Sequence, residues 1–527
     1  MKDRVSLTDF LMYHKETHPI SFHMPGHKGR STLYGIYGFG DFVKNVVGND
    51  ITEIPGADAL QQPRERIKDI MEGYAGLYGA KHTELLVNGS SAGLMASILG
   101  SVPRGGKLLM GRNSHKSVYG ALRLGGIDPV YIMPEIDGET GLQLGLDPDK
   151  IEAALIEDGD IKAVLVTSPN YYGVLSDIER IASIVHLHGR ILIVDQAHGA
   201  HLKFFDYLRS EDGLPHRAAE NCGADIVVDS THKTLLSFTG SAILNICTER
   251  PDVSRISELL RMLQTTSPSY LLMGSLDINQ QILRMDGYNL IKNWDADIKY
   301  FYEEAAQIAG LGLIDRIDLD ETKVSITMSA LGLSGPELAE ELEKRNIWVE
   351  LTHGDYVMLM TGLGNERGDY EDVLSALRDL SAHHGGRIQG VEPESSASKT
   401  ESVAQEAVQK QAKNEAQAAN KNASQPVDKI AELRTPSSDS ALIERLEQRK
   451  IPDTYEEVPL YSAEGRVLYE SIIPYPPGTP IACPGEVLSK SVILYVRDQL
   501  VAQHVVLGVD EEGRVKVESD CVLFKEI

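Results

Sequence analysis

Short apolar runs alternate with longer amphipathic segments over residues 84–246. The runs have the length and β-branched composition of strands, and the segments between them are long enough for helices. The runs are apolar throughout rather than at every second position, which is typical of strands covered on both faces. The pattern therefore predicts an α/β domain with a mostly parallel sheet. The predicted strands are Glu84–Val87, Lys107–Met110, Pro129–Met133, Ala163–Thr167, Ile191–Val194, Ile226–Asp229 and Ala242–Ile246.

The pattern after this sheet predicts a smaller α+β domain. Residues 251–300 have the apolar spacing of helices, and residues 300–385 mix helical segments with short strands. Two of these strands are predicted at Lys323–Met328 and Trp348–Leu351.

A change of composition separates the last part of the chain. Residues 391–430 are rich in alanine, glutamine, lysine and serine, and they have too few large apolar side chains to offset the entropy of ordering. After them, a C-terminal α+β domain is predicted, with strands at Val467–Ser471 and Val492–Val496. The predicted divisions are an N-terminal segment 1–45, a large domain 46–298, a small α+β domain 299–388, a flexible linker 389–430 and a C-terminal domain 431–527.

An acid and a lysine follow two of the predicted strands at the point where each strand ends. Asp195 comes directly after Ile191–Val194, and Lys233 comes shortly after Ile226–Asp229. Ligands of open α/β sheets bind at the carboxyl ends of the strands, so the two side chains could meet at one edge. A lysine that forms a Schiff base and an acid that pairs with a pyridinium nitrogen are the groups that pyridoxal phosphate needs.

Three further motifs follow other strands. A strand ends at Gly89 and a helix is predicted to begin at Ser90 or Ser91, where free N–H groups and hydroxyls suit a phosphate. His115 follows the next strand and could stack on a planar ring. The turn at residues 167–173, which contains Tyr171, would line the pocket.

Each motif taken alone also has an ordinary structural explanation. A serine can cap a helix, a loop histidine can be satisfied by one hydrogen bond, and residues 167–173 can be only a turn. Asp195 can cap the following turn, and Lys233 can be a surface lysine. The joint occurrence of all these groups in this chain order, each at a strand end, favours a pyridoxal-phosphate enzyme.

Charge and cysteine content narrow the class of partner. The formal net charge is −26, which disfavours nucleic acid and anionic membranes as partners. It is compatible with a small cationic substrate, although a surface that only promotes solubility would have the same sign. The four cysteines are scattered and have no zinc-site spacing, which favours a reducing cytoplasm and no metal. No apolar run approaches the roughly 20 residues that span a bilayer.

The chain resembles the bacterial ornithine/lysine/arginine decarboxylases, which have the aspartate-aminotransferase-like fold (fold type I). The resemblance covers nearly the whole chain except residues 391–430. It is similar to the shorter, biosynthetic arginine decarboxylase type, although Gln196 stands where the family often has glutamate. The segments that carry the resemblance are Ser21–Gly29, Asp195–Gly199, Ser230–Lys233, Thr265–Tyr270, Tyr475–Pro480 and Pro484–Glu486.

The resemblance implies a role for each candidate site residue. Lys233 would bind the aldehyde of pyridoxal 5′-phosphate, Asp195 would pair with its ring nitrogen and His115 would stack on the ring. His232 or Lys233 would return a proton to the substrate. The remaining cofactor residues would be Ser90, Ser91, Ala92, His198, Ser230 and His232. The family works as homodimers, and Thr266 would reach a phosphate in the neighbouring subunit. The substrate would contact His23, Tyr171 and Glu486.

The implied reaction is decarboxylation of a basic amino acid, with arginine favoured and lysine or ornithine possible. Two alternatives stay open from the sequence. One is another fold type I activity on amino acids, such as an aminotransferase or an aldolase. The other is a non-catalytic paralogue that regulates an active decarboxylase.

Overall fold

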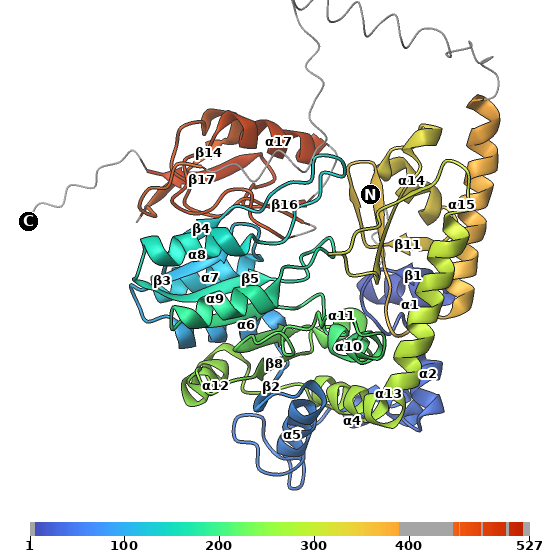
Figure 1. Ribbon diagram of the computed structural model, residues 1–527, viewed down its shortest axis with the longest axis horizontal. Helices are drawn as coiled ribbons and strands as arrows, with labels where there is room; N and C mark the ends of the chain where they lie inside the picture. The colour runs from blue at the N-terminus through green and yellow to red at the C-terminus, as the bar shows by residue number, and fades with distance from the viewer. Residues whose placement is uncertain (1–5, 389–445, 453, 476–477, 502–504, 520–527) are drawn as a thin grey trace, which may run out of the picture.

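A seven-stranded sheet in the order β2-β8-β7-β6-β5-β3-β4 forms the centre of the computed structural model (Figure 1). The structure describes residues 6–388, 446–452, 454–475, 478–501 and 505–519. Strand β8 is antiparallel to both of its neighbours, and the other adjacent pairs are parallel. All seven predicted strands are present: β2 (His82–Leu86), β3 (Lys107–Gly111), β4 (Asp128–Ile132), β5 (Ile161–Thr167), β6 (Ile191–Asp195), β7 (Ile226–Asp229) and β8 (Ala242–Ile246).

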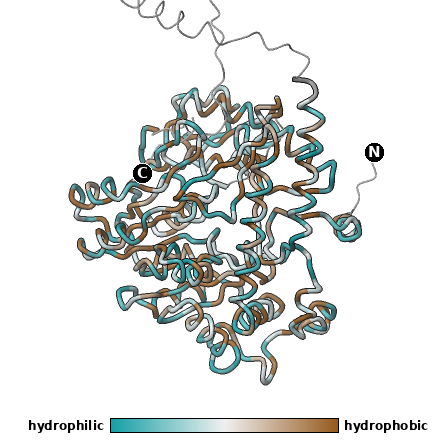
Figure 2. The backbone as a smooth tube through the Cα atoms, turned by 45° about the vertical axis from the view of Figure 1, so that its right-hand side comes forward, coloured by the Kyte–Doolittle hydropathy of each residue, from teal (hydrophilic) through white to brown (hydrophobic). Residues whose placement is uncertain are grey.

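Helices cover both faces of this sheet. Val164 and Val166 of β5 belong to the apolar cluster of α8 (Pro148–Glu157) and α9 (Ile178–Leu187). Ala163 and Leu165 point to the other face, into the cluster of α6 (Gly89–Ser101), α7 (Lys116–Gly125) and α12 (Val253–Leu263). Successive side chains of a strand alternate between faces, so both sets must be apolar. Figure 2 shows the resulting hydrophobic stretches running through the body of the molecule.

A four-stranded antiparallel sheet, β12-β13-β10-β9, organises the second part of the chain. Helix α13 (Tyr270–Ala305) leads into it and packs beside α15 (Arg367–Ile388), as Figure 1 shows. The N-terminal strand β1 (Ile20–Phe22) pairs in parallel with β11 (Ile347–Val349), so the N-terminal segment is joined to this part. The other elements here are β9 (Gly312–Leu313), β10 (Lys323–Thr327), α14 (Gly335–Glu343), β12 (Leu351–His353) and β13 (Tyr356–Met360).

Two predicted elements are divided in the structure. The helical stretch 251–300 becomes α12 and α13, with a turn between them that contains Thr266. The predicted strand Trp348–Leu351 becomes the end of β11 and the start of β12, with Glu350 between the two strands. The remaining helices up to residue 234 are α1 (Leu7–Thr17), α2 (Ser31–Ile36), α3 (Gly40–Lys44), α4 (Val46–Asn49), α5 (Arg66–Tyr78), α10 (Leu202–Glu211) and α11 (Thr231–Thr234).

The C-terminal part differs from its predicted elements. The prediction of a strand at Val492–Val496 is wrong, because these residues lie in helix α17 (Lys490–Val501). Val492, Ile493 and Val496 are buried, at the spacing of one helix face. Val467–Ser471 makes only isolated bridges instead of a strand. The predicted linker 389–430 lies outside the described residues. The strands are β14 (Tyr455–Pro459) paired with β17 (Arg514–Glu518) and β15 (Ile473–Tyr475) paired with β16 (Val505–Leu507).

None of the helices in the described ranges combines the length and the apolar composition that crossing a membrane requires.

A buried ion pair attaches the C-terminal part to the central sheet. Arg112, directly after β3, donates from Nε to Glu486 Oε1 at 3.2 Å and from Nη2 to Oε2 at 2.8 Å. Both side chains are 3% exposed. Glu486 Oε2 also accepts from the backbone N–H of Cys483 at 2.7 Å, and Arg112 Nη1 donates to the carbonyl of Pro480 at 2.8 Å. The guanidinium fork matches the carboxylate, which compensates the cost of burying both charges.

Removal of this carboxylate charge tests the attachment. In Glu486→Gln, Arg112 keeps a buried charge without its counter-ion, so we expect a loss of about 3 to 5 kcal/mol in the free energy of unfolding, measured by urea denaturation. Glu512→Gln is the matched control, because Glu512 pairs with Arg514 at 3.0 Å but is 67% exposed. Equal stabilities of the two variants would contradict a structural role for the buried pair.

Candidate active site

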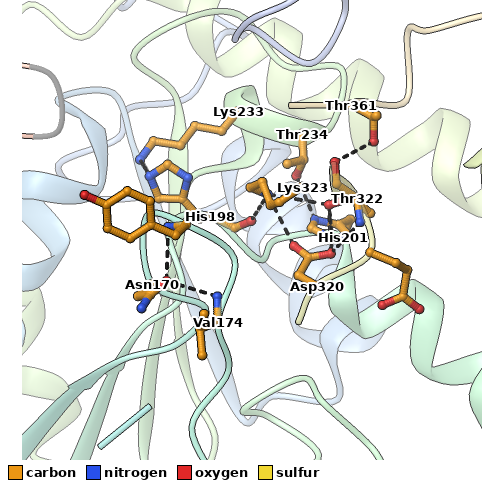
Figure 3. A network of polar contacts seen from close by, with 12 residues as sticks. Asn170, Val174, His198, His201, Lys233, Thr234, Asp320, Thr322, Lys323 and Thr361 are labelled. Carbon is orange, nitrogen blue, oxygen red and sulfur yellow. Dashed lines mark hydrogen bonds and ion pairs between the residues drawn. The ribbon is translucent and has the colours of Figure 1, made fainter. Parts of the chain in front are cut away.

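Lys233 lies at the carboxyl edge of the central sheet. It belongs to the short helix α11, which follows β7 directly, and its Nζ lies 2.9 Å from His198 Nε2 (Figure 3). His198 follows β6, the parallel neighbour of β7. Asp195, the last residue of β6, is 3% exposed and accepts a hydrogen bond from the N–H of Ala197 at 3.2 Å. The structure thus brings the predicted acid and lysine to one edge of the sheet.

The surroundings of Lys233 favour a reactive amine. Burial lowers the pKa of Lys233 to about 8; the carboxylates of Asp195 and Glu350 oppose this shift, and the ammonium of Lys323 adds to it. Burial also raises the pKa of Asp195, and the charge of Lys233 limits that increase. A lysine with a lowered pKa has more of the neutral amine that attacks an aldehyde near neutral pH.

Three histidines surround this lysine as neutral imidazoles. Burial and the charge of Lys233 lower the pKa of His115 to about 3 and hold the pKa of His198 well below its usual value. Burial also lowers the pKa of His232 to about 4. His232 Nδ1 lies 2.8 Å from the carbonyl oxygen of Ser241, which only accepts, so Nδ1 carries the proton and Nε2 can accept one.

The N-terminus of α6 supplies hydroxyl groups on the same side of the sheet. Ser230 Oγ donates to Ser90 Oγ at 3.3 Å, so the residue after β7 meets the first turn of α6. Gly89 begins this helix with φ +71°, and a Cβ there would have no heavy atom within 4 Å. Ser91 and Ala92 occupy the next positions of that turn. The free N–H groups of a helix N-terminus and the two hydroxyls form a site for an anion.

These groups fit the parts of pyridoxal phosphate. The open start of α6 and the Ser90–Ser230 pair suit the phosphate, and the buried Asp195 suits a protonated ring nitrogen. The amine of Lys233 suits the aldehyde. His198 Nδ1 is buried and has no hydrogen-bond partner among the described residues. This nitrogen can therefore form a hydrogen bond with a bound ligand.

The N-terminal signature packs directly on the lysine loop. The N–H of Gly26 donates to the carbonyl of His232 at 2.7 Å, and the N–H of Gly364 donates to the carbonyl of Gly26 at 2.9 Å. A Cβ on Gly26 would lie 2.3 Å from the carbonyl oxygen of Leu235. Only a glycine permits this approach, which explains why a glycine stands between Pro25 and His27.

Two of the three predicted substrate residues meet at a buried acid that sequence reasoning missed. Glu350 Oε1 accepts from the Tyr171 hydroxyl at 3.2 Å, and Glu350 Oε2 accepts from the N–H of Met24 at 3.0 Å. His23 Nε2 lies 3.8 Å from Glu350 Oε2. The ring of Tyr171 stands edge-on to His198 at 4.9 Å. A charged residue inside the apolar run 347–351 was the signal that could have identified Glu350.

Glu486 does not join this group. Both of its carboxylate oxygens bind Arg112 in the ion pair described above, so the expectation that Glu486 binds the substrate is not supported in this chain. Thr266 also lies apart from the group around Lys233, exposed in the turn between α12 and α13. Its predicted contact with a neighbouring subunit stays a prediction.

The contacts of Gln196, which lies beneath the site, explain why this position holds a glutamine where the family often has glutamate. Its Nε2 donates to Glu220 Oε2 at 3.0 Å and to Asp229 Oδ1 at 2.9 Å. Asn245 Nδ2 donates to the same two carboxyl groups at 3.1 Å each. Burial and the neighbouring Glu220 carboxyl hold the pKa of Asp229 well above its usual value. A glutamate at position 196 would bring a third acid into this buried group.

Comparison with known proteins gives the family. Residues 5–311 match a sequence model of the Orn/Lys/Arg decarboxylase major domain, and residues 439–508 match the C-terminal domain of the same enzymes. The chain belongs to the Orn/Lys/Arg decarboxylase family. The predicted assignment to the amino acid decarboxylases is therefore confirmed.

The decarboxylase has relatives of similar length. An arginine decarboxylase of Bacillus cereus is 30% identical over 487 residues, which are 90% of this chain and 95% of that protein. An arginine decarboxylase of Bacillus anthracis is 29% identical over 95% of this chain and 94% of its own length. The solved constitutive lysine decarboxylase of Escherichia coli superposes with a TM-score of 0.68 at 20% identity, covering 97% of this chain and 81% of its own. This likeness confirms the predicted fold class.

The packing of Gly26 in this decarboxylase can be tested by adding one methyl group. Gly26→Ala forces the Lys233 loop to move, so we expect a loss of roughly 1 to 3 kcal/mol in the free energy of unfolding, measured by thermal denaturation. Gly35→Ala is the control, because a Cβ at Gly35 would meet no heavy atom within 4 Å. A Gly26→Ala melting temperature equal to that of the control would rule out the close approach.

Proposed function

We propose that this protein decarboxylates a basic amino acid with pyridoxal 5′-phosphate, and that arginine is the favoured substrate over lysine and ornithine. The observation that carries the proposal is the group of Lys233, Asp195 and His198 at one sheet edge, in a chain of the Orn/Lys/Arg decarboxylase family. The names of two relatives of similar length, both arginine decarboxylases, support arginine.

Each group of the site has a part in this function. Lys233 Nζ would hold the cofactor's aldehyde carbon, Asp195 its ring nitrogen, and Ser90, Ser91, Ser230 and the start of α6 its phosphate. His115 would stack on the ring. When bound, pyridoxal phosphate supplies an electron sink for the bond that breaks. His232, whose Nε2 is free to accept and pass on a proton, and Lys233 are the candidates that protonate the substrate's α-carbon.

Other functions are supported less well. An aminotransferase or aldolase would use the same lysine and acid, and product analysis separates these reactions. A regulatory paralogue would not need the buried lysine with a pKa of about 8 beside Asp195 and His198. The intact group therefore favours an active enzyme.

A homodimer belongs to the proposal. Helix α1 has no buried residue, and its apolar side chains Leu7, Phe10, Leu11, Met12 and Tyr13 are between 50% and 73% exposed. A second copy of the chain would cover them, because contiguous exposed apolar surface marks an interface. In such a dimer the exposed Thr266 would be available to the partner's phosphate.

We also propose that Glu350, instead of Glu486, receives the cationic end of the substrate. The Glu350 carboxylate is fully buried, and within the described ranges its one ion pair is with His23, at 3.8 Å. His23 is 47% exposed, so the acid lies one side chain below the surface. No lysine or arginine of the described ranges lies within ion-pair distance of this carboxylate, although the charges of Lys28 and Lys233 interact with it from further away. A substrate cation would place a positive charge in direct contact with it.

Product analysis tests the function. Purified protein loaded with pyridoxal phosphate is incubated with arginine, lysine or ornithine, and agmatine, cadaverine, putrescine and carbon dioxide are measured. We expect agmatine to form fastest, and Lys233→Ala to lose turnover and the covalent attachment of cofactor after borohydride reduction. A keto acid or an aldehyde as the product, or near-normal turnover in Lys233→Ala, would contradict the proposal.

The role of Glu350 is tested by its neutral isostere. In Glu350→Gln we expect KM for arginine to rise by roughly tenfold, equivalent to about 1.4 kcal/mol, while the affinity for pyridoxal phosphate changes less. Glu366→Gln is the control, because Glu366 is 64% exposed and pairs with Arg30 at the surface. An unchanged KM in Glu350→Gln would leave the acid with a structural role only.

A further inference from the structure

A buried polar network lies beside Lys233 (Figure 3), and none of its residues has a part in the proposed reaction. It consists of Lys323, Asp320, Thr322 and His201, each of which is at most 1% exposed. Lys323 is the first residue of β10, and Asp320 and Thr322 directly precede this strand. His201 lies in the large domain, directly before helix α10. Figure 3 shows this network beside His198 and Lys233. The network therefore joins the small sheet to the lysine loop.

Lys323 is held by three acceptors. Its Nζ donates to the carbonyl of His198 at 3.0 Å, to Asp320 Oδ2 at 3.2 Å and to Thr322 Oγ1 at 3.5 Å. A Cβ on Gly173 would lie 2.8 Å from Lys323 Cβ, so the stem of the lysine is tightly packed as well. Lys323 thus fixes the backbone of the residue whose imidazole contacts Lys233.

His201 makes a second connection, to the residue that follows Lys233. Its Nε2 lies 3.1 Å from Asp320 Oδ1, and its Nδ1 lies 3.2 Å from Thr234 Oγ1. The carboxylate only accepts, so Nε2 carries the proton and Nδ1 accepts from the Thr234 hydroxyl. Burial would raise the pKa of Asp320, but His201 and Lys323 hold it well below its usual value. The ionised carboxylate of Asp320 therefore holds both Lys323 and His201 in place.

We propose that Lys323, Asp320 and His201 are positioning residues. They hold His198, which contacts Lys233, and Thr234, which follows Lys233 in the chain, and they keep a positive charge near the amine of Lys233. The proposal rests on the proposed function only in that Lys233 is the residue that binds the cofactor. Its structural part is independent of the reaction and of the substrate.

The charges around Lys233 decide what each variant should do. Asp195 and Glu350 raise the pKa of Lys233, Lys323 lowers it, and the imidazoles of His115, His198 and His232 complete its surroundings. Removal of the positive charge at position 323 should raise the pKa of Lys233 from about 8. Removal of the negative charge at position 320 should lower it, whereas a site that only becomes looser and wetter would raise it in both variants.

The test measures the titration of Lys233 in the full chain stripped of cofactor. Lys233 is labelled with trace acetic anhydride between about pH 6 and pH 10, and its peptide is quantified by mass spectrometry. In Lys323→Met we expect the midpoint to rise by about one unit, so labelling at pH 7 slows roughly tenfold. In Asp320→Asn we expect the midpoint to fall.

Lys203→Met is the matched control. Lys203 is another buried lysine, 8% exposed, whose Nζ donates to Asn221 Oδ1, so its loss should not move the midpoint. A midpoint unchanged in Lys323→Met, or raised in both Lys323→Met and Asp320→Asn, would overturn the proposal. The labelling experiment contains no substrate and no cofactor, so its result stays valid even if the protein does not decarboxylate any of the three amino acids. Likewise, an unchanged midpoint would not contradict the proposed decarboxylation.

Discussion

The site depends on one amine that the fold keeps out of water. Burial disfavours the charged form of Lys233, and the nearby carboxylates of Asp195 and Glu350 limit the shift, so its pKa settles at about 8. Without burial the lysine would be an ordinary ammonium group, and without the acids its cost of burial would be larger. The other features of the site either produce this environment or use it.

Three distant parts of the chain produce it together. The parallel pair β6 and β7 brings Asp195, His198 and Lys233 to one edge of the central sheet. The N-terminal signature closes on the lysine loop through Gly26. The small sheet contributes Lys323, and the residue between β11 and β12 contributes the carboxylate of Glu350. The two sheets are therefore coupled through the residues that surround the amine, so a displacement of the small sheet would change the chemistry of Lys233.

Buried charges elsewhere in the protein follow the same rule of compensation. Arg112 and Glu486 neutralise each other where the C-terminal part meets β3. Beneath the lysine loop, the amides of Gln196 and Asn245 donate to the carboxyl groups of Asp229 and Glu220. These pairs concern one predicted substrate residue, Glu486, and one residue that differs from the family's common pattern, Gln196. Glu486 has an ion-pair partner in its own chain, and Gln196 donates to both acids beneath the site.

The sequence by itself determined the large sheet, because its strands are covered on both faces and appear as continuous apolar runs. It also determined the positions of Asp195, His115 and Lys233 at strand ends, since that relation is local in the chain. In the C-terminal part the local pattern was insufficient: Val492–Val496 is apolar enough for a strand, but its packing requires a helix. Only the tertiary structure decided the contacts of Glu350, Lys323 and Glu486. Each of them contacts a residue more than a hundred positions away (Tyr171, His198 and Arg112 respectively), and contact between such residues depends on the fold rather than on local periodicity.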